Sequence, residues 1–200
     1  DNKPVWSEPV RLLDGHRELE EKYGMCEIEI IRNVDNDCLI LIARANNRVS
    51  NSVICYSDNE GKTWTSPKEL PNCLTGDRHK AEYDPVSGKV IISFRQYLSN
   101  GKKFKKSALS PDLYLTEGWV AWIGAFDDLM RFASDNVKDY TYGDKVVILG
   151  KNYNKADCGY SGVVILEDGT VITDSYGYFS PTARYPYIMQ AKFKIADVLK

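Results

Sequence analysis

Short runs rich in Val, Ile, Tyr and Trp alternate along the chain with clusters of Gly, Pro, Asn and Asp, and sustained helical periodicity is almost absent. This pattern is typical of antiparallel β-sheets. Residues 127–133 are the best candidate for a short helical turn. The sequence therefore predicts an all-β protein. Its predicted strands lie at 6–13, 26–32, 38–44, 52–57, 64–70, 79–83, 89–95, 119–126, 144–150, 160–166, 170–178 and 187–195.

The predicted strands fall into groups along the chain. Residues 15–72 carry four strands, and residues 73–153 repeat that design around a long irregular insertion. Residues 154–200 carry three strands, and residues 1–14 hold one orphan strand of a preceding unit. Four short strands in about fifty residues are the size of one β-propeller blade.

One turn between predicted strands has a specific sequence. Residues Ser57 to Trp64 read Ser-Asp-Asn-Glu-Gly-Lys-Thr-Trp and fit the pattern S-x-[D/N]-x-G-x-T-W, in which Thr63 is the conserved threonine of the pattern. We expect Asn59 to accept local backbone hydrogen bonds, Gly61 to adopt a positive φ and Trp64 to pack beneath the turn. The motif resembles the Asp-box of sialidase-like β-propellers, with Asn59 where Asp is commoner. The motif implies a type of fold, and it does not by itself imply a catalytic activity.

The resemblance implies a six-bladed propeller when complete. Six blades of ~40–50 residues need roughly twice this length. The chain, which begins without an initiator Met, is therefore expected to be the C-terminal half, with about three blades. The upstream half would then be needed to complete a central site.

The amino-acid composition argues against several classes of function. The net charge of −2 does not indicate a basic surface that would bind nucleic acid. Five Cys without a C-x-x-C pair indicate neither a zinc site nor a complete disulfide framework. No run is long enough to span a bilayer, so membrane insertion is not expected. We predict no cofactor. Thirteen Tyr and four Trp suit both β-structure and sugar binding.

The segment from Tyr160 to Thr170 carries the most specific resemblance to sialidases, in which Tyr-Ser, a strand and Asp-Gly-Thr precede the last strands. In that family this Tyr is the catalytic nucleophile. A neutral phenol activated by a Glu avoids repulsion from the sialic acid carboxylate. The resemblance gives Tyr160 this role, and an ordinary strand tyrosine is the alternative.

A second match lies in residues 15–72. Arg44 falls in register with one of three family arginines that clamp the substrate carboxylate. Met25 occupies the position of the family's Glu, and Glu27 lies two residues further on. Because side chains alternate along a strand, Glu27 is expected on the same face and is the candidate base for Tyr160. An exposed strand glutamate is the alternative.

The third family arginine, expected near the start of strand 119–126, is absent. The chain offers Asp77, Arg78 and His79 at the start of another strand and Arg95 at a strand end. We predict substrate binding by these Asp and Arg residues and acid–base chemistry by His79, whose side chain titrates near neutrality. A hydrogen-bonded structural histidine is the alternative. Tyr176 is predicted at an aromatic rim of the site.

The leading interpretation is an exo-acting, sialidase-like glycoside hydrolase that removes a terminal, acidic sugar from glycans with Tyr160 and Glu27. One alternative is a His-dependent propeller of rhamnosidase or lyase type. Another is a non-catalytic carbohydrate- or protein-binding propeller. Family members act outside the cytoplasm, so the resemblance implies a secreted or periplasmic protein.

Overall fold

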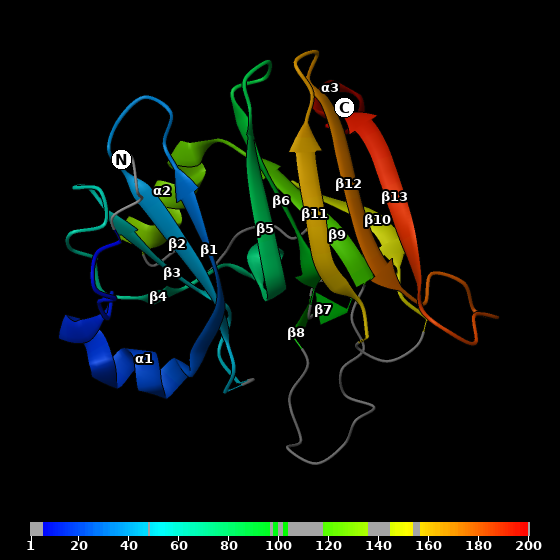
Figure 1. Ribbon diagram of the computed structural model, residues 1–200. Helices are drawn as coiled ribbons and strands as arrows, with labels where there is room; N and C mark the ends of the chain where they lie inside the picture. The colour runs from blue at the N-terminus through cyan, green and yellow to red at the C-terminus, as the bar shows by residue number, and fades with distance from the viewer. Residues whose placement is uncertain are drawn as a thin grey trace.

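A computed structural model of the chain describes residues 6–47, 49–96, 98–99, 102–103, 118–135, 145–153 and 157–199. Three antiparallel sheets make up most of the structure (Figure 1). The first has the order β1 (Met25–Arg32), β2 (Leu39–Ala45), β3 (Val53–Ser57) and β4 (Lys68–Glu69). The second has the order β5 (Gly76–Asp84), β6 (Lys89–Gln96), β9 (Gly118–Gly124) and β10 (Val146–Lys151). The third has the order β11 (Gly159–Ile165), β12 (Thr170–Gly177) and β13 (Tyr187–Lys194).

Short elements connect or flank these sheets. A small hairpin pairs β7 (Leu98–Ser99) with β8 (Lys102–Lys103). The helical elements are η1 (Asp14–His16), α1 (Arg17–Tyr23), η2 (Asn72–Leu74), α2 (Phe126–Ser134) and α3 (Ile195–Val198). The predictions of an all-β architecture and of a helical turn at 127–133 are thus confirmed.

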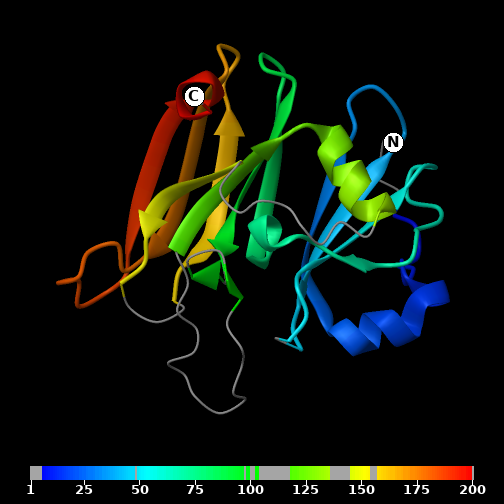
Figure 2. The same ribbon diagram turned by 180° about the vertical axis from the view of Figure 1, so that it is seen from behind.

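The first strands of the three sheets lie side by side. In Figure 1, β1, β5 and β11 stand next to one another and run upward from the lower end of the molecule. From each of them the other strands of its sheet follow in order outward, as Figure 2 shows from behind. The three sheets draw their strands from residues 15–72, 73–153 and 154–200.

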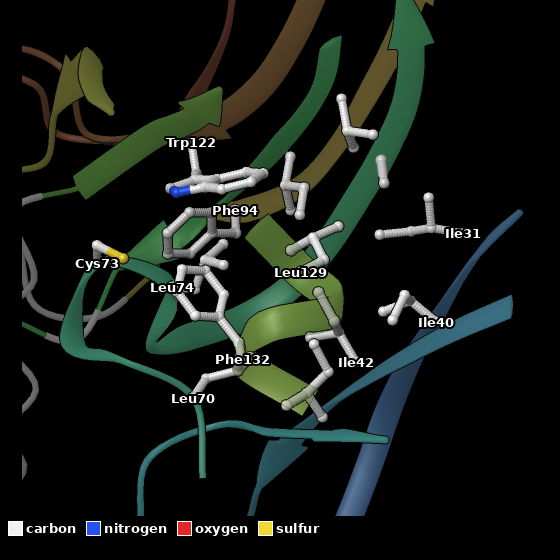
Figure 3. Close-up of a cluster of buried hydrophobic side chains, with 14 of the residues drawn as sticks. Ile31, Ile40, Ile42, Leu70, Cys73, Leu74, Phe94, Trp122, Leu129 and Phe132 are labelled. Carbon is white, nitrogen blue, oxygen red and sulfur yellow. The ribbon is translucent and has the colours of Figure 1, made fainter. Parts of the chain in front are cut away.

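Apolar side chains fill the two spaces between neighbouring sheets. The largest cluster lies between the first two sheets, where α2 inserts Leu129 and Phe132 against Ile42, Phe94 and Trp122 (Figure 3). A second cluster lies between the second and third sheets. The middle sheet is therefore covered on both faces, as its near-continuous apolar strands require.

The turn at residues 57–64 closes as the motif predicts. The Asn59 Oδ1 atom accepts a hydrogen bond from the Thr63 backbone N–H at 2.9 Å. Gly61 has a φ of +81°, and the Trp64 indole N–H donates to the Gly61 carbonyl oxygen at 3.2 Å. The Ser57 hydroxyl oxygen accepts from the Gly61 N–H at 2.8 Å. The local bonds of this turn were thus readable from the sequence.

One prediction about the N-terminal region is wrong, and one element there was not predicted. Residues 6–11 form no strand, and Trp6 and Val10 are 87% and 77% exposed, because no described strand lies beside them to pair with. Residues 17–23 form α1, which the strand-like pattern did not indicate. This helix is rich in straight-chain Arg, Glu and Lys and ends at Gly24, whose φ of +59° lets its N–H cap the last turn.

Candidate functional site

The three inner strands share one local irregularity, a β-bulge near their first residues. In each bulge one residue other than glycine has a positive φ: Glu27 at 48°, Arg78 at 58° and Tyr160 at 54°. This conformation is uncommon for such residues and redirects their side chains. The register shifts lie between Cys26 and Glu29, between Asp77 and Lys80, and between Gly159 and Gly162.

The strands that pair with these bulges present a second set of equivalent side chains. Arg44 on β2, Arg95 on β6 and Tyr176 on β12 each lie opposite the residue at which the bulge begins. Each of the three sheets therefore has the same arrangement, a bulge residue beside a residue of the paired strand, but with different side chains. Because β1, β5 and β11 are neighbours, the three copies meet at the lower end of Figure 1.

Glu27 and Arg44 form a close ion pair at the site. The Arg44 Nη1 atom lies 2.7 Å from Glu27 Oε1, and both side chains are largely buried. Nη2 of Arg44 donates to Asn46 Oδ1 at 2.7 Å, and Nε lies at an ion-pair distance of 3.3 Å from Asp77 Oδ1 without a hydrogen bond between them. Arg44 is thus held in one orientation by contacts within the chain.

Arg78 reaches across to the third sheet. Its Nη1 atom donates to the Cys158 carbonyl oxygen at 2.9 Å and to the Tyr176 hydroxyl at 3.1 Å. Its guanidinium carbon lies 3.9 Å from the centre of the Tyr160 ring, which is a cation–π contact. Its Nε atom is 3.8 Å from Glu27 Oε1. Arg78 therefore lies between the candidate base and the candidate nucleophile.

Asp157 is a site residue that strand periodicity did not single out. It accepts a hydrogen bond from the Tyr176 hydroxyl at 3.0 Å. Burial raises the pKa of Tyr176, and the hydrogen bond to Asp157 adds to this effect, whereas Arg78 opposes it. Tyr176 thus acts as a neutral donor that links Asp157 to Arg78. The one feature of the sequence that could have indicated Asp157 is its position directly before the strand that carries Tyr160.

A cavity of about 260 Å³ lies over these bulges. The Tyr160 side chain is 65% exposed beside it, so its hydroxyl is accessible to a ligand. The cavity thus brings an accessible phenol, a carboxylate and cationic groups to one surface. Its lining residues are Glu27, Ile28, Arg78, His79, Lys80, Tyr160 and Ser161.

Asp77 and Arg95 were predicted to bind substrate, and the structure encloses both side chains. Asp77 has no exposed side-chain surface, and Arg95 is only 6% exposed. The two side chains form an ion pair with each other through Arg95 Nη2 and Asp77 Oδ2. Neither residue is among those that line the cavity, so direct substrate contact by Asp77 or Arg95 stays a prediction.

His79 is largely buried at the edge of the cavity. Its Nε2 atom lies 3.0 Å from the Leu74 carbonyl oxygen, its ring stacks on Phe94 at 4.9 Å, and it is 5% exposed. Burial lowers the pKa of His79 to about 4, although the Leu74 carbonyl opposes this shift. These contacts are those of the structural alternative for His79, and because the residue also lines the cavity its acid–base role stays a prediction.

The described part of the chain contains no cluster of three or more His, Cys, Asp or Glu side chains that would hold a metal ion. It also contains no helix with the length and apolar character needed to cross a membrane.

No protein-family model matches the sequence, and no curated protein is similar to it. A solved structure of a protein of unknown function from Dyadobacter fermentans is similar over 84% of the chain, with a TM-score of 0.59 and 17% identity. Intramolecular trans-sialidases from Ruminococcus gnavus and from a leech are each similar over 86%, with TM-scores of 0.47 and 0.46 and identities of 17% and 18%. The chain spans 37%, 33% and 24% of these structures. At such identities the likeness concerns the fold alone.

Proposed function

We propose that this chain is the C-terminal half of a sialidase-like β-propeller that acts as an exo-glycoside hydrolase on a terminal acidic sugar. The observation that carries the proposal is the convergence of Glu27, Arg78 and Tyr160, each from a bulge of a different inner strand, on one cavity. Three sheets whose first strands lie side by side are consistent with three blades around an axis.

In the proposed reaction the Tyr160 hydroxyl oxygen attacks the anomeric carbon. Glu27 takes the phenolic proton, and the bond from the anomeric carbon to the leaving oxygen breaks. An acid in the upstream half would protonate that oxygen. Water then releases the sugar from Tyr160, and the configuration is retained. Arg78, beside both groups, and Arg44 supply the positive charge that an acidic sugar requires.

A non-catalytic sugar-binding propeller is the second candidate. Within the described residues no hydrogen bond joins Glu27 to Tyr160, and the contacts of Glu27 are to Arg44 and Arg78. The Glu27 carboxylate is thus paired with guanidinium groups and not with the phenol that it would have to deprotonate. Binding without turnover is the outcome that would favour this candidate.

The decisive experiment uses a full-length protein that contains this chain and 4-methylumbelliferyl glycosides of sialic and uronic acids. We expect release of the fluorophore with the wild type. Tyr160→Phe removes the attacking oxygen and keeps the ring, so kcat should fall by about a thousandfold or more. Tyr185→Phe, at a tyrosine that is 80% exposed and outside the cavity, is the matched control and should leave kcat unchanged.

Two results would overturn the proposal. If Tyr160→Phe is as active as the wild type, Tyr160 is not the nucleophile. If calorimetry detects binding of acidic sugars while no glycoside is cleaved, the protein is a binding module.

A further inference from the structure

We infer that Asp77 is a positioning residue that fixes the orientation of Arg44, and through Arg44 that of the Glu27 carboxylate, from the neighbouring sheet. This inference rests on the proposed function, since it concerns the same site. It assigns to Asp77 a task other than the substrate contact that its place in the sequence suggested.

The first argument is geometric, because Asp77 uses its two oxygens for two different cations. Oδ1 lies 3.3 Å from Arg44 Nε, and Oδ2 pairs with Arg95 Nη2. Arg95 is opposite Asp77 in the register of β5 and β6, so this pair anchors the carboxylate within its own sheet. The other oxygen is thereby left facing Arg44, which belongs to the first sheet.

The second argument concerns the other side of Arg44. The Arg44 Nη1 atom, bonded to the same carbon as Nε, is 2.7 Å from Glu27 Oε1. A guanidinium is planar and rigid, so the attraction of Nε to the Asp77 carboxylate 3.3 Å away also favours one direction of Nη1. The carboxylate of Glu27 is therefore placed by a residue that it does not touch.

The third argument is the order of charges. Arg95, Asp77, Arg44, Glu27 and Arg78 form a chain of alternating sign that runs across two sheets. Without the negative charge of Asp77, two largely buried guanidinium groups would be left facing each other. Arg44 would then lose its ion pair with the second sheet and keep only the contacts with Glu27 and Asn46.

The buried carboxylate also makes this device sensitive to pH. Burial raises the pKa of Asp77 to about 6, because lost hydration outweighs the attraction of Arg95 and Arg44, and the charge of Glu27 adds to the rise. The groups that face Asp77 are Arg95 from β6, Arg44 from β2, and Glu27 and the Cys26 thiol from β1. Protonation of Asp77 is expected to release Arg44 while the strands stay paired.

The test compares the wild type with Asp77→Asn in the full-length protein. Asp84→Asn is the matched control, since Asp84 is a buried aspartate at the other end of the same strand and only caps the turn at Val86 and Ser87. We expect Asp77→Asn to lower kcat by about a hundredfold, as small misplacements of catalytic groups do, with KM changed far less. The acid limb of the wild-type kcat profile near pH 6 should be absent from Asp77→Asn and present in Asp84→Asn.

A readout that needs no activity is the ¹³C signal of the Glu27 carboxyl carbon during a pH titration of the wild type. We expect an inflection near the pH at which Asp77 takes up its proton, and its loss in Asp77→Asn. If Asp77→Asn does not fold, the wild-type titration alone decides.

Each result has one meaning. A Glu27 signal that is insensitive to Asp77, or equal kcat losses and unchanged pH profiles in Asp77→Asn and Asp84→Asn, would overturn the inference. If no glycoside is cleaved by the wild type, the proposed function fails. The Glu27 titration still decides whether Asp77 controls the site.

Discussion

At the scale of single residues, Asp77 and His79 show how one bulge separates neighbouring side chains. Residues two apart in a regular strand share a face. The bulge at Arg78 breaks this rule, so Asp77 contacts Arg44 and Arg95 while His79 contacts Leu74 and Phe94. Asp77 therefore belongs to the ion pairs behind the cavity, whereas His79 packs against Phe94 at the edge of the cavity.

The low pKa of His79 predicts a pH dependence of stability. The unfolded chain protonates His79 below its ordinary value of 6.5, whereas the folded chain does so only near 4. Between these values the unfolded state binds more protons, so the folded state loses stability as pH falls, by at most about 1.4 kcal/mol per pH unit.

The contribution of His79 is isolated by comparing the wild type with His79→Phe in urea unfolding at pH 7 and pH 5. Asp77 has the opposite sign, since its raised folded pKa makes its contribution fall with rising pH, and it is common to both proteins. We expect His79→Phe to lose less stability than the wild type on acidification. An equal loss would show that His79 is not buried in its neutral form.

At the scale of elements, the three bulged strands and their partners are the unit from which the site is made. The bulge of β11 places Tyr160 beside Arg78 only because Gly159, at a φ of +132°, lets the two strands approach closely. A Cβ atom at residue 159 would lie 2.8 Å from Arg78 Cδ. The position of Arg78 thus depends on a residue with no side chain on the next sheet.

Gly159→Ala should therefore disturb both fold and site. The strained φ and the clash should lower the free energy of unfolding by about 1–3 kcal/mol. The variant should also displace Arg78 from the Tyr160 ring. Gly15→Ala is the matched control, because a Cβ atom there meets nothing within 4 Å. Denaturant unfolding and a crystal structure would measure the two effects, and a variant as stable as Gly15→Ala would contradict the expected strain.

At the scale of the whole molecule, the third sheet is covered on one face only. Val163 and Val171 pack toward the second sheet, whereas Val164 and Ile188, on the other face, are 57% and 78% exposed. In the proposed propeller this face would meet a further blade. An exposed apolar face of this kind favours association.

We therefore expect the 200-residue chain to self-associate when it is expressed alone. Light scattering after size exclusion should show a concentration-dependent mass. The double variant Val164→Lys with Ile188→Lys should shift the chain toward the monomer, and Val34→Lys, an exposed loop residue on the first sheet, is the control. A monomeric wild type at high concentration would show that this face needs no partner.

Short apolar runs between turn signals located most of the strands, because strand-forming residue types and turn residues are local properties of the sequence. The turn at residues 57–64 was equally readable, since the bonds of Asn59 and the φ of Gly61 involve only near neighbours. The helix α1 and the missing strand at 6–11 were not, because strand pairing depends on a partner elsewhere in the chain.

For the candidate site, too, the sequence predicted some features and not others. Its residue types and the three segments that hold them were visible in the sequence, and Glu27, Arg78 and Tyr160 do meet at one cavity. Only the tertiary structure decided which carboxylate is accessible, which arginine faces the cavity and which arginine is enclosed. The reason is physical: a bulge turns a side chain without leaving a trace in local periodicity, and burial depends on contacts between sheets that lie far apart in the sequence.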